Sequence, residues 1–412
     1  MNVALTLDCR FFRTPDGAVW SQGVHPYSFL SRYLAIFDGV KVVARLRDVD
    51  RCESHWHPAS GLGVKFMPVP DYLGPWQYLA RSLAVRRAIC AAVDARDAVI
   101  MRVGSQIAGC LEPLLVRRGQ PYGLQIVNDP FEIFTPNSVE YLGRPIFRWY
   151  LTKQLRRQCK RACAAAYVTD KTLQQRYPCG RFSTTFSDVE ITPAALVATP
   201  RTFSPDRALG KEYRLVTVCS LTQMYKAPDV SIRALAEGVR AGLNLTLRIV
   251  GDGRHRAAME RLTAALGLAG RVFFLGQLPA GQPVREALDA ADLFLLPSRS
   301  EGLPRALIEA MARSLPCIAS NVGGIPELLP SEDLVAPGDT QSLVSKLIEV
   351  LGNPGRMNAM AAGNLRRAAD FREDLQACRR NSFLREVRRI TSCYLAGAAP
   401  SGSLTKPEAA WY

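Results

Sequence analysis

Both halves of this 412-residue chain alternate short apolar segments with segments of helical periodicity, and this alternation restricts the fold more than any other feature. In the first half, strands are predicted at Val3–Leu7, Val40–Ala44, Val64–Met67, Ala98–Met101, Gly123–Val127 and Ala164–Val168, with helices such as Tyr27–Phe37 and Tyr78–Val93 between them. The second half begins again with a strand at Tyr213–Cys219. Such alternation indicates βαβ units with parallel strands. The sequence therefore predicts an α/β protein with two Rossmann-like domains.

A proline-bearing segment separates the two halves. Thr192-Pro193, Thr199-Pro200 and Ser204-Pro205 lie within fourteen residues, which is typical of a linker. We therefore expect a first domain at residues 1–195, a linker at 196–211, a second domain at 212–373, a helix at 374–396 and a disordered tail at 397–412.

The composition is that of a soluble globular protein, with 48% hydrophobic and 22% charged residues. No apolar run approaches the roughly 20 residues that a bilayer crossing requires. Met1-Asn2 leads directly into a predicted strand, so we expect no signal peptide. Without an export signal, the eleven cysteines are expected to be reduced thiols.

Three short motifs have residue types and spacings found in metal sites, but each is interpreted as structural. Cys159 and Cys163 have no second pair to complete a site, and His55 and His57 have no carboxylate arrangement around them. Asp48-Val49-Asp50 follows an early strand and is interpreted as a surface loop. We expect neither a metal nor a cofactor.

The net charge of +15 favours anionic partners, such as nucleotide phosphates, nucleic acid or acidic lipid headgroups. The stretch Tyr141–Thr169 contains seven Lys and Arg residues and no acidic residue, with aromatic side chains among them, and Arg372–Arg389 is also basic. One interpretation of residues 141–161 is a solvated helix face. The other is an interfacial helix that docks on an anionic membrane. Nucleic acid is not an expected partner, because no basic-aromatic recognition motif is found.

The segment Glu301–Met311 places a glutamate, a glycine and a proline immediately before an apolar helix, with Glu309 following eight positions after Glu301. The preceding Asp292–Pro297 has the pattern of a buried strand. A strand that leads into a helix N-terminus presents unpaired N–H groups and the positive end of the helix dipole, which bind anions. The two carboxylates repel phosphate but accept hydrogen bonds from hydroxyls, so the combination indicates a nucleotide sugar.

These residues resemble the family-4 (group 1) glycosyltransferases, which are retaining enzymes of the GT-B fold. Glu301 and Glu309 match the E-x7-E motif of that family. The neighbouring strands and turns of the family are matched in order at Leu247–Gly253, Arg271–Gly276, Leu315–Ser320 and Gly323–Glu327. The resemblance covers about residues 213–345, and it implies that the helix at 374–396 crosses back to the first domain.

The resemblance implies that the second domain binds the donor. Glu309 would accept hydrogen bonds from the ribose, Glu301 would meet the donor sugar or the positive charge at its anomeric carbon, and Lys226 would neutralise the diphosphate. Further donor-binding candidates are Gly302 and Leu303, through their N–H groups, and Gly251, Arg305, Gly323 and Gly324. Ser220 and Ala227 stand where the family usually has an arginine and a glycine.

The first domain would hold the acceptor. Asp129 follows a predicted strand and is a catalytic candidate together with Glu301 and Lys226, and His25 in the first loop is a second acceptor-side candidate. For His25 a plain loop position is the alternative.

The resemblance implies a metal-independent hexosyltransferase that moves a sugar from a nucleoside diphosphate to a hydroxyl of a saccharide or lipid-linked saccharide. The basic aromatic stretch at 141–161 suggests an acceptor at a membrane, so we expect a cytoplasmic protein at the inner face of the membrane that acts in surface polysaccharide or glycolipid synthesis. The implied mechanism is a front-face displacement in which the leaving diphosphate helps to deprotonate the acceptor. A sugar-nucleotide epimerase or hydrolase of the same fold and a catalytically silent scaffold remain as alternatives.

Overall fold

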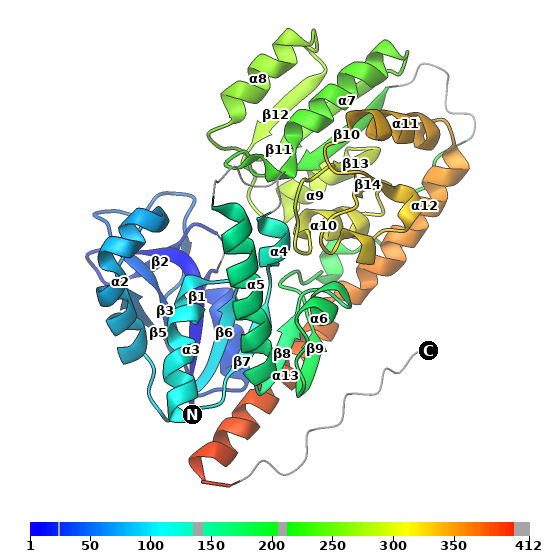
Figure 1. Ribbon diagram of the computed structural model, residues 1–412. Helices are drawn as coiled ribbons and strands as arrows, with labels where there is room; N and C mark the ends of the chain where they lie inside the picture. The colour runs from blue at the N-terminus through cyan, green and yellow to red at the C-terminus, as the bar shows by residue number, and fades with distance from the viewer. Residues whose placement is uncertain (24, 135–142, 205–211, 399–412) are drawn as a thin grey trace. The chain divides into compact units, whose positions relative to one another are not determined.

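The structure is a computed structural model that describes residues 1–23, 25–134, 143–204 and 212–398, which form two compact units (Figure 1). The N-terminal unit contains Met1–Asn128, Tyr150–Phe186 and the described residues from Ala377 onward. The C-terminal unit contains Asp129–Trp149 and Ser187–Gln376, apart from the undescribed positions. The predicted tail at 397–412 lies outside the described residues from position 399 onward, as does the part of the predicted linker at 205–211.

The N-terminal unit is built on one sheet, whose strands from β5 onward alternate with helices. Its strands are β1 (Asn2–Arg13), β2 (Val19–Ser21), β3 (Gly39–Asp48), β4 (His57–Pro58), β5 (Val64–Val69), β6 (Ala98–Val103), β7 (Gly123–Ile126), β8 (Ala164–Tyr167) and β9 (Phe182–Thr185). The order β5-β3-β1-β6-β7-β8-β9 is parallel throughout, while β2 pairs antiparallel with β1 and β4. The prediction of a parallel sheet is confirmed.

Helices cover both faces of this sheet. They are α1 (Tyr27–Leu30), α2 (Gly74–Ala91), α3 (Gln106–Arg118), α5 (Arg144–Arg161), α6 (Thr172–Arg176) and α13 (Glu373–Leu395), and the short α4 (Pro130–Ile133) follows β7. Helices α2, α3 and α5 bury Val85, Leu111 and Leu155 in one apolar cluster. The other cluster contains Phe29 and Phe383 of α1 and α13. The C-terminal helix thus completes the core of the N-terminal unit.

Two elements of this unit differ from the prediction. Strand β1 continues past the predicted Leu7 to Arg13, because a register shift between Thr6 and Arg10 lets it pair with β3 again. The predicted helix at Tyr27–Phe37 is instead one turn of α-helix followed by a 3-10 turn at Ser31–Ala35. Aromatic residues crowd this segment, and their side chains lose rotamer freedom in an α-helix.

The C-terminal unit has a second parallel sheet. Its strands are β10 (Tyr213–Val218), β11 (Leu245–Val250), β12 (Val272–Gly276), β13 (Leu293–Leu296), β14 (Cys317–Ser320) and β15 (Leu334–Val335), in the order β12-β11-β10-β13-β14-β15. Successive side chains of a strand point to opposite faces. Accordingly, Leu215 and Leu293 join one buried cluster and Val216 and Phe294 join the other.

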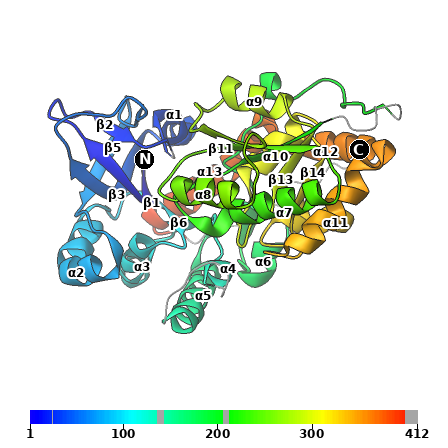
Figure 2. The ribbon, with the colours of Figure 1, turned by 90° about the horizontal axis from the view of Figure 1, so that it is seen from above.

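Helices again lie on both faces of this second sheet. They are α7 (Pro228–Arg240), α8 (Arg256–Ala265), α9 (Gln282–Asp289), α10 (Arg305–Ala312), α11 (Thr340–Leu351) and α12 (Pro354–Ala368). Helices α7, α8 and α11 pack on the Leu215 face, and α9 and α10 on the Phe294 face. Figure 2 shows α7 and α8 running in front of the strands of this unit.

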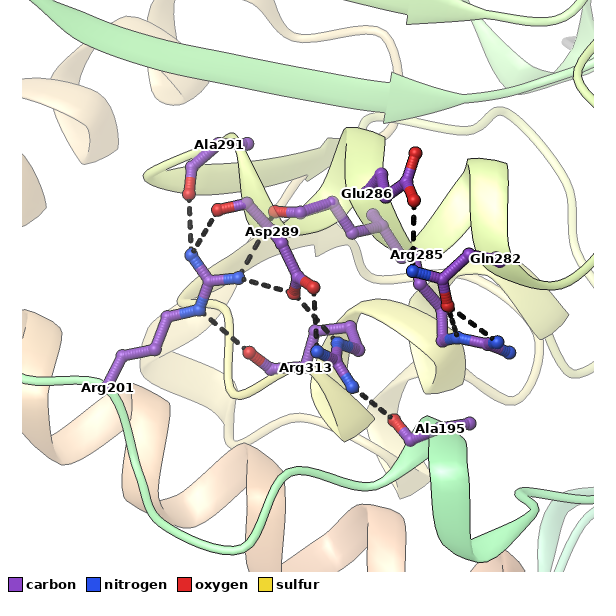
Figure 3. A network of polar contacts seen from close by, with 9 residues as sticks. Ala195, Arg201, Gln282, Arg285, Glu286, Asp289, Ala291 and Arg313 are labelled. Atoms are coloured by element: carbon purple, nitrogen blue, oxygen red, sulfur yellow. Dashed lines mark hydrogen bonds and ion pairs between the residues drawn. The ribbon is translucent and has the colours of Figure 1, made fainter.

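The described part of the expected linker is attached to the C-terminal unit by arginines (Figure 3). Arg201 donates to the carbonyl oxygens of Arg313 and Ala291, each at 2.8 Å, and pairs with Asp289 at 3.1 Å. Arg313 binds the same carboxylate at 2.7 Å and the carbonyl oxygen of Ala195 at 3.1 Å. Burial lowers the pKa of Arg201, which remains a cation. The segment from Ala195 to Arg201 is therefore part of the packed structure of this unit.

Candidate functional site

The candidate site lies where the strand order of the C-terminal sheet reverses. The chain runs outward from β10 through β11 to β12, then returns to the other side of β10 to form β13. Strands β10 and β13 are parallel neighbours, with Leu215 opposite Leu293. The loops that follow them therefore leave the same edge in opposite directions, which is the position where ligands bind in open α/β sheets.

Each of these two loops contributes one charged side chain, and the two side chains meet. Lys226 follows β10, Glu301 follows β13, and the ammonium nitrogen lies 2.6 Å from Glu301 Oε1. Ser298 donates to the same oxygen at 2.8 Å. The side chains of Lys226 and Glu301 are only 13% and 5% exposed. The predicted catalytic pair is thus a buried ion pair at the switch point of the sheet.

Arg299 attaches the Lys226 loop to the Glu301 loop. Its backbone N–H donates to the carbonyl oxygen of Tyr225 at 2.7 Å, and its guanidinium donates to that of Met224 at 2.9 Å. The same guanidinium binds both carboxylate oxygens of Asp229, the second residue of α7, at 2.9 and 2.6 Å. The position of Lys226 is therefore fixed by contacts on both sides of it.

Ala227, next to Lys226, has a backbone conformation that suits glycine. Its φ of +52° and ψ of 50° lie in the left-handed region, and its side chain is fully buried. Because left-handed backbone is costly for residues other than glycine, the family's usual glycine at this position has a conformational explanation. The loop keeps this conformation with alanine.

Two of the glycines predicted to bind the donor lie in close backbone contacts. A Cβ atom on Gly251 would lie 1.9 Å from the carbonyl oxygen of Cys219, and one on Gly323 would lie 2.0 Å from that of Glu301. Gly324 donates its N–H to the carbonyl oxygen of Gly302 at 2.7 Å. Gly251 thus supports the loop after β10, and Gly323 and Gly324 hold the loop that carries Glu301.

The backbone just before helix α10 has N–H groups without an acceptor among the described residues. Pro304 occupies its N-cap and offers no side-chain cap. Among the described residues, none accepts a hydrogen bond from the N–H of Gly302 or Leu303. Such groups, with the positive end of the helix dipole, stabilise an anion. The exposed Arg305, the first residue of α10, adds a cation at the same end.

Glu309 lies one turn further along α10 and is half-buried. Its carboxylate forms no hydrogen bond or ion pair with another described residue. Burial raises its pKa, and the positive charges of Arg305 and Arg285 oppose that shift. A partly accessible, unpaired carboxylate near an anion site is suited to accept hydrogen bonds from ligand hydroxyls.

The two acceptor-side candidates are both buried. Asp129 caps α4 by accepting a hydrogen bond from the N–H of Phe131 at 2.9 Å. The ring of His25 meets the ring of Phe29 edge to face at 4.7 Å. Asp129 therefore has a structural role as a helix cap, and His25 is a packed residue of its loop.

Ser298, Arg299 and Asp229 are site residues that the sequence analysis did not single out. Their only sequence signal is position, since Ser298 and Arg299 directly follow the proline that ends β13. Across the part of the chain that the structure describes, no three His, Cys, Asp or Glu side chains are grouped as a metal site. All eleven cysteines are free thiols, as expected.

Comparison with known proteins finds sequences similar to this chain. The sequence profile of the family described as "Glycosyl transferases group 1" matches residues 212–353. The chain is 27% identical to protein CapJ of Staphylococcus aureus over 372 residues, 89% of this chain and 91% of CapJ. It is 35% identical to D-inositol 3-phosphate glycosyltransferase of Rhodococcus jostii over 199 residues, 45% of this chain and 43% of that protein. The chain thus matches less than half the length of the latter relative.

Solved structures share the fold over nearly the whole chain. Sucrose-phosphate synthase from Thermosynechococcus elongatus has a TM-score of 0.67 at 16% identity, covering 94% of this chain and 99% of that chain. WaaG, a glycosyltransferase of lipopolysaccharide biosynthesis, has a TM-score of 0.61 at 18% identity, covering 95% and 99%. Anabaena HepE, in complex with UDP and glucose, has a TM-score of 0.60 at 15% identity, covering 96% and 99%. These likenesses show the GT-B fold.

Proposed function

We propose that this chain is a glycosyltransferase that transfers a hexosyl group from a nucleoside-diphosphate sugar to an acceptor hydroxyl, because residues 212–353 match the group 1 glycosyltransferase profile and the chain has the GT-B fold. The observation that carries this proposal is the meeting of Lys226 and Glu301 at the β10–β13 switch point, beside the open N-terminus of α10. The cation and the free N–H groups suit the diphosphate of such a donor. The two carboxylates suit the hydroxyls of the sugars on either side of it.

In this proposal, different residues of the site bind different parts of the donor. Lys226 and the N–H groups of Gly302 and Leu303 bind the diphosphate and stabilise the charge that develops as it leaves. Glu309 accepts hydrogen bonds from the ribose hydroxyls. Glu301 contacts the donor sugar and stabilises the positive charge at its anomeric carbon.

The reaction we propose retains the configuration of the sugar. The bond between the anomeric carbon and the phosphate oxygen breaks, and the acceptor oxygen bonds to the same face of that carbon. The proton of the acceptor hydroxyl passes to the departing phosphate oxygen. The protein orients the reactants and stabilises charge, and no residue forms a covalent bond to the sugar. Because Lys226 and the N–H groups stabilise the leaving group, we expect turnover to be insensitive to a chelator.

We further propose a saccharide or lipid-linked saccharide as the acceptor, in surface polysaccharide or glycolipid synthesis. In support, one relative is named as a phosphatidylinositol monomannoside mannosyltransferase and WaaG is titled as a lipopolysaccharide enzyme. Asp129 and His25 remain the acceptor-side candidates. Incorporation of labelled sugar into lipid extracts, compared with water-soluble saccharides, would identify the acceptor class.

The exposed side chains of helix α5 support our proposal that the protein works in the cytoplasm, at the inner face of the membrane. Ile146, Trp149 and Tyr150 are 71%, 62% and 56% exposed, on a helix with seven basic and no acidic residues. Part of this charge is engaged within the protein, since Arg157 and Arg161 pair with the buried Glu112. Positions 141 and 142 of the predicted basic segment lie outside the described residues. Among the described residues, no helix has both the length and the apolar character to cross a membrane.

Thermal stabilisation against a panel of nucleoside diphosphates and nucleotide sugars tests the donor site. A ligand at 100 times its dissociation constant adds about 2.7 kcal/mol to the free energy of unfolding. We expect one nucleotide family to raise the melting temperature, Glu309→Ala to abolish that rise, and Glu286→Gln on the surface of α9 to preserve it. If no nucleotide shifts the native protein, the proposal fails and a silent scaffold is favoured. Turnover of a nucleotide sugar without any acceptor would instead indicate an epimerase or hydrolase.

A further inference from the structure

Helix α2 of the N-terminal unit has its apolar ridge on the outside. Trp76, Leu79 and Leu83 are spaced three and four positions apart and are 79%, 59% and 71% exposed. Leu73, directly before the helix, is 58% exposed. Residues three and four apart share one face of a helix, so these side chains form a continuous stripe. An ordinary surface helix points such a stripe at the core.

The opposite face of α2 already supplies the core. Val85 and Ile89 are fully buried in the cluster that contains the helices beside the sheet, and Tyr78 packs against that cluster. Both views show α2 next to α3 at the outer side of this unit (Figures 1 and 2). The folding of the unit therefore does not require the outward ridge.

The charges of α2 are all of one sign. The helix contains Arg81, Arg86 and Arg87 and no aspartate or glutamate. Arg81 donates to the carbonyl oxygen of Asp71 at 2.6 Å. Arg86 and Arg87 are exposed, and neither forms a hydrogen bond or an ion pair with another described residue. Arg87 lies in line with Trp76 and Leu83 along the helix, so cationic and apolar side chains point the same way.

We propose that the outward face of α2, defined by Trp76, Leu79, Leu83, Arg86 and Arg87, docks on an anionic lipid bilayer. Tryptophan and leucine enter the boundary between headgroups and acyl chains, and arginine side chains stay at the level of the anionic headgroups. The charge selects this occupant. A second copy of the chain would bring two uncompensated arginine clusters together, whereas acidic headgroups neutralise them. This surface is separate from α5 and rests on the proposed function only for its purpose, which is to bring the enzyme to a lipid-linked acceptor.

Flotation of the full chain with vesicles at low salt tests this surface. We expect binding to phosphatidylcholine vesicles that contain phosphatidylglycerol, and weak binding to phosphatidylcholine alone. Arg86→Gln/Arg87→Gln should weaken binding about 25-fold, because each arginine near an anionic surface contributes about a fivefold effect. Arg240→Gln/Arg261→Gln removes the same charge from exposed positions of α7 and α8 and should leave binding close to that of the native protein.

The apolar ridge has its own matched pair of variants. Leu79→Ser/Leu83→Ser should reduce binding to anionic vesicles about tenfold or more, since it removes apolar area from the outward face that would enter the bilayer. Phe273→Ser/Ile348→Ser changes two exposed apolar residues of the C-terminal unit and should preserve binding. Nucleotide-dependent thermal stabilisation should be the same in all four variants, so a failure of docking is distinguishable from a failure of the donor site.

Two results would overturn the proposal. One is unchanged vesicle binding by the α2 variants, which would assign docking to α5 or to no part of the protein. The other is a native oligomer in light scattering that dissociates in Leu79→Ser/Leu83→Ser, which would make the ridge an interface between copies of the chain.

Discussion

Arg299 binds both carboxylate oxygens of Asp229, at 2.9 and 2.6 Å, and through this pair joins the loop after β13 to the start of α7. The segment between β10 and Asp229 carries Lys226, whose ammonium group reaches back to Glu301 at 2.6 Å. Arg299 and Asp229 touch neither end of the ion pair. They are positioning residues that keep Lys226 within reach of the diphosphate.

Replacing Arg299 with lysine should therefore weaken donor binding without removing any group that contacts the donor. Lysine cannot reproduce two parallel hydrogen bonds to a carboxylate. We expect a loss of about 1.5–3 kcal/mol in the free energy of unfolding, the range for hydrogen bonds to charged groups. Donor KM should rise more than kcat falls. Arg313→Lys breaks a comparable pair with Asp289 (Figure 3), which makes no contact with the Lys226 side chain, and should cost similar stability while leaving donor KM unchanged. Equal effects of both variants on KM would show that the role of Arg299 is only structural.

Much of this arrangement follows from local sequence. The strand before Pro297, the glycine after Glu301 and the apolar helix after Pro304 predict a strand, loop and helix, and the structure contains them as β13 and α10. The direct contact between Lys226 and Glu301 was not predictable, because the two residues lie 75 positions apart and meet only when β10 and β13 become neighbours. The resemblance assigned a role to each residue separately, but not the pairing of their charges.

The role of Arg299 could not be predicted from the sequence for a different reason. An arginine after a strand is compatible with ligand binding, with solvent exposure or with an ion pair, and sequence does not distinguish these states. The outward ridge of α2 is similar, since the apolar periodicity of Tyr78–Val93 predicts a helix correctly but does not say which of its apolar faces meets the core. Only the packing of Val85 and Ile89 decides that question.

The pairing of Lys226 with Glu301 predicts a distinctive pattern of stabilities. Lys226→Met leaves a buried carboxylate without its cation and should cost about 3–5 kcal/mol in the free energy of unfolding. The double variant Lys226→Met/Glu301→Gln should recover most of that loss, because no uncompensated charge remains. Both variants should lack transferase activity. Denaturant unfolding of the two single variants and the double variant gives the coupling energy. Additive losses would contradict the ion pair.

Glu309 should limit stability at neutral pH while serving the donor. Burial raises its pKa above the ordinary 4.5, and a carboxyl with a raised folded pKa makes the protein less stable as pH rises from 4.5 through the folded value. Glu309→Gln removes this effect. The ligand-free variant should melt at a higher temperature than the native protein at pH 7, and the difference should vanish below pH 4.5.

The same variant should bind nucleotide about ten- to a hundredfold more weakly, because a neutral amide is a poorer acceptor than a carboxylate for the ribose hydroxyls. Glu286→Gln, on the surface of α9, serves as the control and should change neither the pH dependence nor the affinity. A Glu309→Gln protein that is less stable than native at pH 7 would refute the raised pKa.

The close contact of Gly323 with the Glu301 loop provides the last prediction. Gly323 and Gly338 both have left-handed backbone, with φ of +55° and +77°. An added Cβ at Gly323 would lie 2.0 Å from the carbonyl oxygen of Glu301, whereas nothing lies within 4 Å of one at Gly338. Gly338→Ala should therefore cost only the backbone strain, about 1–2 kcal/mol. Gly323→Ala adds a steric overlap and should cost roughly 4 kcal/mol or more in the free energy of unfolding. Losses of this size arise from specific structural causes such as overpacking. Because that overlap displaces the loop between β13 and α10, Gly323→Ala should also lose nucleotide-dependent stabilisation, which Gly338→Ala should keep. Equal losses of stability in the two variants would show that the Glu301 loop moves aside at little energetic cost and that Gly323 does not hold it in place.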